Sequence, residues 1–168
     1  MILGEDFWAR PATELAPILL GKWLCVKLDG VLHRHRITET ECYFGEEDTA
    51  CHAHKGKTPR TEVLYRAGGI TYVYLCYGIH SLLNLVTGPE GHPEAVLIRG
   101  IEGASGPGRV TKLLALSCRQ NALPLTPECG IWVEDDGSPT PSFEALPRVG
   151  IGYASPEDIR RPWRFLIK

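Results

Sequence analysis

The sequence predicts an α+β fold, a single domain over residues 1–168 built on a curved antiparallel β-sheet with a few flanking helices. Segments rich in β-branched and aromatic residues outnumber the helical patterns, so strands dominate. Asp29-Gly30 is a strong hairpin signal, which favours antiparallel pairing. With 168 residues, the chain can bury one substantial core, and no internal repeat or linker divides it.

The first expected element is a short helix. Pro11 suits its first turn, aliphatic residues from Leu15 to Leu19 follow at helical spacing, and Gly21 should end it. Pro17 lies inside this pattern, where proline removes a hydrogen bond and costs about 3 kcal/mol. We therefore expect a kink or two half-helices.

Two hairpins should follow the helix. The first joins Lys22 to Leu28 with Val31 to Tyr43, and the second joins Ile70 to Cys76 with Leu82 to Val86. Between the hairpins, residues 44–62 lack sustained periodicity and contain glycine and proline, which is typical of a long functional loop.

The second half of the chain alternates short elements with turns. We expect a strand from Ala95 to Arg99 and a helix from Arg109 to about Leu116, opened by Gly106-Pro107-Gly108. Residues 119–147 are rich in proline and leave room for one short strand at Ile131 to Glu134. The last expected strand is Trp163 to Ile167.

Composition narrows the class of protein. No apolar run approaches a membrane span and the N-terminal residues lack the pattern of a signal peptide, so we expect a cytoplasmic protein, or a nuclear one in a eukaryote. The six cysteines form no Cys-x-x-Cys pair, so we expect mostly small buried hydrophobes and no metal cluster. The pairs His33/His35 and His52/His54 have the spacing of one strand face, which leaves a metal site conceivable, but no third ligand is suggested.

A row of functional side chains lies on the strand that ends the first hairpin. Alternation puts Glu39, Glu41 and Tyr43 on one face, with Thr40 and Cys42 on the other. Two carboxylates and a phenol on one face could form a catalytic site or a solvated surface.

Several separated motifs decide between these alternatives. They are Glu39-Thr40-Glu41-x-Tyr43, Gly45-Glu46-Glu47-Asp48-Thr49-Ala50-Cys51-His52, Gly56-Lys57-Thr58-Pro59-Arg60, the tyrosine-rich strand with Asn84, then Arg99, Gly106-Pro107-x-Arg109, Arg148-Val149-Gly150-Ile151-Gly152-Tyr153 and Arg161-Pro162-Trp163-Arg164-Phe165. In this order they resemble the alkyladenine (3-methyladenine) DNA glycosylases, which excise damaged purines without a helix-hairpin-helix domain. The resemblance covers most of the chain and implies an open-barrel-like sheet of the formyltransferase C-terminal type. It departs at Cys42, where alanine is usual, and at Thr61, where asparagine is common.

The resemblance implies a pocket for an extruded base. A base inside a duplex must be flipped out before chemistry, and aromatic rings can then stack on it at roughly 1–3 kcal/mol per ring. Tyr43, His52 and Tyr74 match the base-pocket positions, and Tyr77 matches the residue that inserts into the duplex. Without the resemblance, these tyrosines would read as ordinary sheet-face aromatics.

The resemblance also assigns the chemistry. Glu41 would be the general base and Arg99 would hold the attacking water and the carboxylate, although Arg99 alone could be a surface arginine. Glu39 shares the face of Glu41, but the motif puts the catalytic carboxylate directly before Cys42. Asn84 would exclude the 2-amino group of guanine, or would simply close a hairpin strand.

Four arginines are candidates for contacts with DNA phosphates: Arg60, Arg109, Arg148 and Arg161. The formal net charge of −2 is unfavourable for tight binding to undamaged DNA. Lys55 and Lys57 raise the alternative of a Schiff-base lyase, which we do not expect.

The sequence thus predicts a monomeric, monofunctional DNA glycosylase that acts on damaged purines in double-stranded DNA and needs no cofactor. A zinc base deaminase is disfavoured because the chain has no His-x-Glu followed by Pro-Cys-x-x-Cys. A non-catalytic nucleic-acid-binding module on the same fold remains the alternative.

Overall fold

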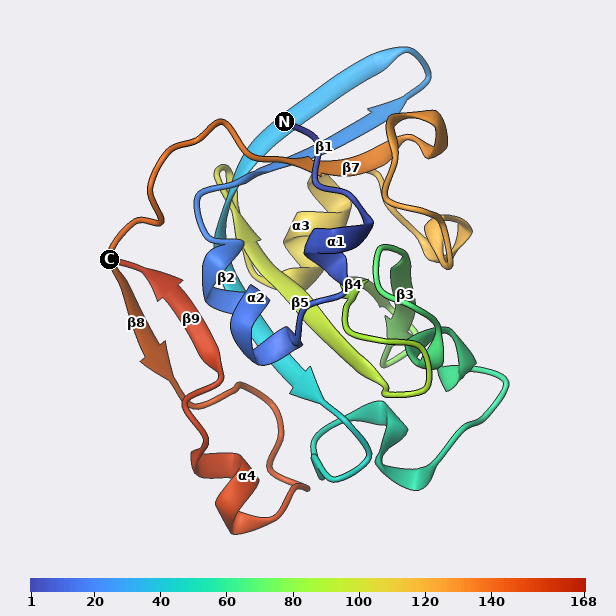
Figure 1. Cartoon of the computed structure of the whole chain (residues 1–168), viewed down its shortest axis with the longest axis vertical. Coiled ribbons are helices and arrows are strands. Elements are labelled where there is room, and N and C mark those ends of the chain that lie inside the picture. Colours follow the sequence, from blue (N-terminus) through green and yellow to red (C-terminus); the bar gives the residue numbers. More distant parts are fainter.

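A computed structural model describes all of residues 1–168, and one nine-stranded antiparallel sheet dominates it (Figure 1). Its main path runs β3-β4-β5-β2-β1-β7, and β3 and β7 stay unpaired with each other, so the sheet is open. The strands are β1 (Trp23–Leu28), β2 (Val31–Phe44), β3 (Thr71–Cys76), β4 (His80–Val86), β5 (Glu94–Ile101), β6 (Ala104–Ser105), β7 (Ile131–Glu134), β8 (Phe143–Leu146) and β9 (Arg164–Ile167). The predicted α+β class and antiparallel sheet are confirmed.

Strand β2 organises the sheet because it pairs with three neighbours. Its first half, Val31 to Arg36, pairs with β1, while Ile37 to Phe44 pairs with β5. Residues 39–41 also pair with β9. Two register shifts, between Ile37 and Thr40, mark the change of partner, and such bulges bend a strand. The functional octet therefore lies where the sheet curves.

Both predicted hairpins form. Asp29 and Gly30 have φ of +50° and +77°, the left-handed conformation that a tight β1–β2 turn needs. At the tip of the β3–β4 hairpin, Tyr77 and Gly78 also have positive φ, +53° and +67°. Positive φ is ordinary for glycine but uncommon for tyrosine.

The core lies on one face of the sheet. Cys42, Leu85, Val96 and Ile98 alternate onto this face and join a cluster of 25 buried apolar residues with three helices: α1 (Glu5–Trp8), α2 (Ala12–Ile18) and α3 (Pro107–Leu113). Each buried large side chain contributes about 1.5–3 kcal/mol. Because successive residues in a strand point to opposite faces, the side chains between these core residues lie on the other face of the sheet, outside this core.

The opposite face is partly covered by the long loop after β2. This loop contains two short 3₁₀ helices, η1 (His52–Lys55) and η2 (Thr61–Tyr65), and packs a second cluster of eight buried residues onto the sheet. In Figure 1 the loop lies below the ends of β2 and β5, near the final helix α4 (Pro156–Arg160).

The helical predictions need correction. Pro17 does not split a helix: it is the next-to-last residue of α2, where its missing N–H removes only one hydrogen bond. Pro11 caps α2 instead of lying in its first turn, and α3 ends at Leu113. The helix α4 and strand β8 were not predicted. Ser155-Pro156 was a usable signal for α4, because Ser155 caps the helix and Pro156 opens it.

No helix has both the length and the apolar character needed to cross a membrane. All six cysteines are free thiols, and Cys25, Cys42 and Cys51 are buried. The expectation that most cysteines are buried is therefore met by only half of them.

Candidate active site

A cavity of about 1080 Å³ opens on the sheet face opposite the core. Its walls come from β2, β3, β4 and β5, from the loop after β2, from the start of α3, and from residues 149–153. Nine of the eleven predicted site residues line it: Glu41, Tyr43, His52, Arg60, Tyr74, Tyr77, Asn84, Arg99 and Arg109.

Glu41 is fully buried, with a relative exposure of 0%, yet it lines the cavity. Its Oε1 accepts a hydrogen bond from the Tyr43 hydroxyl at 2.8 Å, and its Oε2 accepts one from the Val149 amide at 2.7 Å. The Arg99 Nε lies 3.8 Å from the same Oε2. One donor on each oxygen fixes the plane of the carboxylate and leaves lone pairs free for a water molecule.

The environment of Glu41 disfavours its charged form. Burial raises the pKa of Glu41 above its ordinary value, and Arg99, the Val149 amide and the Tyr43 hydroxyl oppose that rise. Burial and the nearby charge of Glu41 raise the pKa of Tyr43 well above its ordinary value, so the phenol remains a donor. A buried carboxylate with a raised pKa is suited to accept a proton.

Glu39 shares the face of Glu41 but lies in a different electrostatic environment. Its Oε2 lies 3.0 Å from Arg164 Nη1 and 3.4 Å from Arg99 Nε. Two cations thus neutralise Glu39, whereas Glu41 has Arg99 alone at a longer distance. The charge of Glu39 is therefore compensated more closely than that of Glu41.

Three aromatic rings form one wall of the cavity. The ring centroids of His52 and Tyr74 lie 4.4 Å apart at an interplanar angle of 66°, and Tyr72 lies 5.5 Å from Tyr74. His52 Nδ1 is 3.0 Å from the Tyr72 hydroxyl. Burial, with a smaller effect from Arg60, lowers the pKa of His52 to about 4, so the imidazole is neutral at neutral pH. Tyr72 was not among the predicted site residues, although the alternation Tyr72-x-Tyr74 puts both rings on one face.

Asn84 lies in the middle of the sheet beside the cavity. It is opposite Leu97 of β5 and Tyr72 of β3, and it is buried. Its Nδ2 donates to the backbone carbonyl of Tyr72 at 3.2 Å, which fixes the orientation of the amide. A buried amide held at the cavity surface can exclude a substrate group by its volume or by leaving a donor unpaired.

Tyr77 stands at the rim of the cavity and is 90% exposed. Two other apolar side chains near the hairpin tip, Leu75 and Ile79, are also exposed. An exposed apolar tip with a tyrosine in left-handed conformation contributes nothing to the core, which points to contact with another molecule.

Comparison with known proteins identifies the family. The model of the methylpurine-DNA glycosylases matches residues 6–104 and 102–168. Relatives named "Putative 3-methyladenine DNA glycosylase" include one from Psychrobacter cryohalolentis, 45% identical over 91% of this chain and 86% of the relative. Another, from Methanocella arvoryzae, is 41% identical over 99% and 92%, and one from Nitrosococcus oceani is 44% identical over 99% and 90%.

The chain belongs to the methylpurine-DNA glycosylase family. The predicted enzyme class, a DNA glycosylase that hydrolyses N-glycosyl bonds, is confirmed at this level, and DNA is the substrate that the family implies.

The candidate phosphate-binding arginines of this glycosylase occupy different environments. Arg60 and Arg109 are exposed and line the cavity, and Arg60 lies 5.2 Å from the centre of the Tyr74 ring. Arg161 lies away from the cavity, with its guanidinium paired to Glu157 and Asp158. Those two carboxylates already offset its charge.

Arg148 is in the wrong environment for a phosphate contact. Its side chain has an exposure of 0% and forms an ion pair with the equally buried Asp48. A guanidinium that is inaccessible to solvent cannot meet the backbone of a docked duplex, so the sequence prediction for Arg148 is corrected. The basic composition of the C-terminal segment favours a position on the surface. Arg148 is buried instead, because it pairs with Asp48, a hundred residues earlier in the chain.

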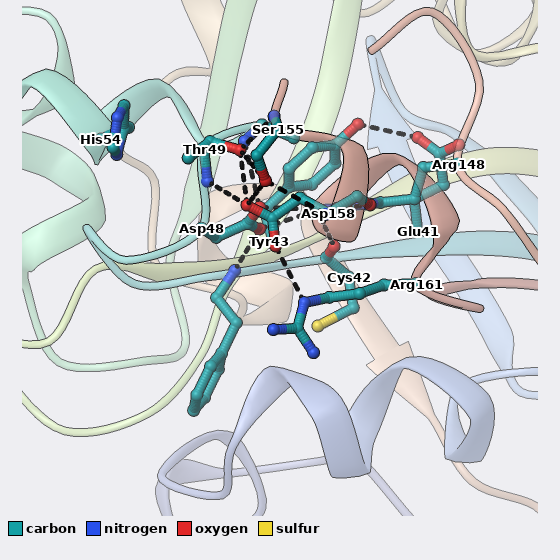
Figure 2. Close-up of polar contacts among 12 residues, drawn as sticks. Glu41, Cys42, Tyr43, Asp48, Thr49, His54, Arg148, Ser155, Asp158 and Arg161 are labelled. Carbon is teal, nitrogen blue, oxygen red and sulfur yellow. Dashed lines mark hydrogen bonds and ion pairs between the residues drawn. The ribbon is translucent and has the colours of Figure 1, made fainter. Parts of the chain in front are cut away.

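A polar network on the same side of the molecule was also missed (Figure 2). Asp158 accepts hydrogen bonds from the amide and hydroxyl of Thr49, and from Ser155 and Arg161. It joins the loop after β2 to the segment that brings Val149 to Glu41. Backbone amides leave no sequence signal, so the role of Val149 was not predictable.

No three His, Cys, Asp or Glu side chains lie close enough together to hold a metal ion. His33 and His35 share a face of β2, with ring centroids 6.4 Å apart. His52 and His54 do not lie on a strand, because the 3₁₀ helix η1 contains both. The expectation that this pair shares a strand face is wrong.

Proposed function

We propose that this glycosylase, acting as a monomer, flips a damaged purine nucleotide out of double-stranded DNA and hydrolyses its N-glycosidic bond without forming a covalent intermediate. The observation that supports this most directly is the buried carboxylate of Glu41, held by Tyr43, Val149 and Arg99 at the surface of an aromatic cavity. A cavity of about 1080 Å³ is large enough for a nucleoside.

The reaction that this geometry supports needs one base. A water molecule held beside Glu41 and Arg99 attacks the anomeric carbon of the flipped nucleotide, and the bond to the purine nitrogen breaks with its electron pair going to the base. Glu41 takes a proton from the water, and its negative charge stabilises the oxocarbenium-like transition state. The products are a free purine and an abasic sugar.

The proposed substrate class is supported by the weak acidity of three groups expected around the base: Tyr43, His52 and Tyr72. At neutral pH His52 is neutral, with its pKa at about 4, and burial raises the pKa of Tyr43 and Tyr72. None of these groups readily donates a proton to a leaving purine. Purines that carry a positive charge from alkylation, such as 3-methyladenine, leave as neutral molecules and need no proton. We therefore propose alkylated purines as the principal substrates, with deaminated and etheno purines as slower ones.

The remaining predicted residues take roles around this centre. Tyr77, exposed at the hairpin tip, would fill the space that the flipped base leaves, while Tyr43, His52 and Tyr74 would contact the base. Arg60 and Arg109, exposed at the cavity, would bind flanking phosphates.

The experiment that tests this function uses Glu41→Gln, which keeps the side-chain shape but removes the base. We expect the wild type to release free 3-methyladenine with multiple turnovers, and the variant to bind a lesion-containing duplex without releasing the base. Tight binding without release by the wild type would indicate the non-catalytic module. Near-normal excision by Glu41→Gln would falsify Glu41 as the base.

Two further measurements test the monofunctional mechanism. Borohydride should trap no covalent adduct with lesion DNA, and an adduct lost in Lys55→Ala or Lys57→Ala would establish a Schiff-base lyase. Excision should continue in EDTA, because a carboxylate activates the water in this mechanism. Loss of activity that added zinc or magnesium restores would contradict the proposed site.

A further inference from the structure

Arg148 is a buried side chain that lies next to the cavity-lining residue Val149 but does not line the cavity itself. Its two terminal nitrogens donate to the two carboxylate oxygens of Asp48, at 2.7 and 3.0 Å. They also donate to the backbone carbonyls of Cys42 and Asp158, at 3.0 and 3.3 Å. This bidentate geometry fixes both the position and the plane of the guanidinium.

Aromatic rings fix the guanidinium further. The carbon at its centre lies 5.0 Å from the centroid of Tyr43 and 5.0 Å from that of Trp163. Tyr43 is the same ring that donates to Glu41, so Arg148 contacts one of the groups that hold the carboxylate.

The backbone after Arg148 provides the second link to Glu41. Val149 is about half exposed, yet its amide donates to Glu41 Oε2 at 2.7 Å. Residues 147–150 form no backbone–backbone hydrogen bond, and Gly150 has a positive φ of +73°. Since the side chain of Val149 has little to pack against, the buried guanidinium one residue earlier is the anchor of this amide.

The anchor is not optimised for stability alone. The Arg148 Nε is the one buried side-chain polar atom without a hydrogen-bond partner, and a buried ion pair often adds little net stability. A role in fixing the geometry of neighbouring groups would explain why the charged pair of Arg148 and Asp48 is buried at this position.

We infer that Arg148 is a positioning residue for catalysis: paired with Asp48, it holds the Val149 amide and the Tyr43 ring against the Glu41 carboxylate. This inference rests on the proposed role of Glu41 as the base. It assigns Arg148 to the geometry of the carboxylate and not to DNA binding.

The test replaces Arg148 by lysine, which can keep an ion pair with Asp48 but cannot also bridge to the two carbonyls or offer a planar guanidinium to the two rings. We expect single-turnover excision of an alkylated purine to fall about tenfold, equivalent to roughly 1.4 kcal/mol, with lesion binding unchanged. The acidic limb of the pH–rate profile should move to higher pH, because the Val149 amide lowers the pKa of Glu41.

A matched control is available in Arg36→Lys. Arg36 also pairs with an aspartate, Asp136, donates to a carbonyl, that of Gly21, and stacks on an aromatic ring, that of Trp23. It lies outside the cavity lining, so its replacement should leave the rate and the acidic limb unchanged.

Should Arg148→Lys melt below the assay temperature, Val149→Pro removes the amide donor while leaving the buried pair intact, and it should move the acidic limb in the same direction. An unmoved limb in the folded variant would overturn the inference. Weaker DNA binding, with a salt dependence reduced by about one charge, would also overturn it, because that result indicates a phosphate contact.

The two proposals can fail separately. If Glu41→Gln is inactive while Arg148→Lys behaves as wild type, only the inference about Arg148 fails. If Glu41→Gln is active, the proposed function fails.

Discussion

The hydroxyl of Tyr43 donates a hydrogen bond to Oε1 of Glu41 over 2.8 Å, from two residues farther along strand β2. Residues two apart in a strand share a face, so this contact needs no rearrangement of the backbone. Because the pKa of Tyr43 is raised well above its ordinary value, the phenol stays protonated at neutral pH and holds Glu41 as an acceptor. A ring proposed to stack on the flipped base is therefore also part of the carboxylate's support.

Glu41→Gln should stabilise the protein while abolishing excision. The folded-state pKa of Glu41 is raised above 4.5, so ionising this group in the folded protein costs stability at neutral pH. A neutral amide removes that cost. We expect a gain of about 1 kcal/mol at neutral pH, which corresponds to a melting temperature higher by roughly 2–4 °C.

The gain should depend on pH in a defined direction. The gain in stability should be full at pH values above the folded-state pKa of Glu41. It should vanish below pH 4.5, where Glu41 is protonated in both the folded and unfolded states. Glu39→Gln is the control, because Glu39 is neutralised by Arg99 and Arg164 and its loss should destabilise. Thermal melts across this pH range measure both, and a destabilised Glu41→Gln would contradict the prediction.

The contrast between Glu41 and Arg148 explains what could be predicted from sequence. Strand alternation is local, so the shared face of Glu41 and Tyr43, and the hairpin tip at Tyr77, could be read from spacing. Arg148 is buried by an ion pair with Asp48, a hundred residues away, and a single sequence contains no sign of that pairing. The Val149 amide is a backbone donor, which any residue except proline supplies, so its identity gave no signal.

Arg99→Gln should move the acidic limb of excision to higher pH. The charge of Arg99 is the strongest influence that opposes the raised pKa of Glu41, from 3.8 Å. Without it the carboxylate protonates at higher pH, so the acidic limb should move in the same direction. The measurement is a single-turnover pH–rate profile on a duplex with one alkylated purine.

Arg164→Gln serves as the control for Arg99, because it removes the other partner of Glu39 but makes no ion pair with Glu41. Its acidic limb should stay in place. If the two variants move the limb equally, then the effect passes through Glu39 and Arg99 does not act on Glu41 directly.

His52 should make the protein sensitive to acid. Its pKa is about 4 in the folded protein and 6.5 ordinarily, so the unfolded state binds a proton first as the pH falls. The contribution of His52 to the free energy of unfolding is therefore full above pH 6.5 and is lost progressively as the pH falls to about 4. The loss is at most about 3 kcal/mol, at 1.36 kcal/mol per pH unit. His52→Gln should flatten this loss in denaturant titrations, whereas His54→Gln, at the exposed neighbour, should not. Equal pH dependence in the wild type and His52→Gln would show that another group is responsible.

Tyr77→Ala should slow excision from duplex DNA more than from single strands. The ring is 90% exposed and adds little to folding, so its loss removes only what it offers to DNA. In a duplex that contribution offsets an unstacking cost of a few kcal/mol, which a single strand does not pay. Tyr77→Phe keeps the ring and should restore the duplex rate. Equal losses on both substrates, accompanied by a lower melting temperature, would assign Tyr77 to packing of the hairpin.

Asn84→Ser should admit undamaged guanine. Guanine differs from hypoxanthine only by an exocyclic amino group, which a snug site can exclude by collision or by leaving a donor unpaired. Asn84 is buried at the cavity surface and its Nδ2 is held by the Tyr72 carbonyl, so a shorter side chain leaves space there. In paired single-turnover assays on otherwise identical duplexes, we expect guanine excision to rise relative to hypoxanthine excision by about tenfold, the effect of roughly 1.4 kcal/mol.

A second substitution at the same position separates the two ways of excluding guanine. Asn84→Leu keeps most of the volume but removes the amide, so the ratio of guanine to hypoxanthine excision should stay low if exclusion works by collision. It should rise, as in Asn84→Ser, if exclusion depends on the polar amide group itself. Mismatched duplexes, where extrusion is easy, should give the largest differences. If the ratio moves in neither variant, Asn84 only supports the hairpin through its bond to Tyr72, and guanine is excluded elsewhere in the cavity.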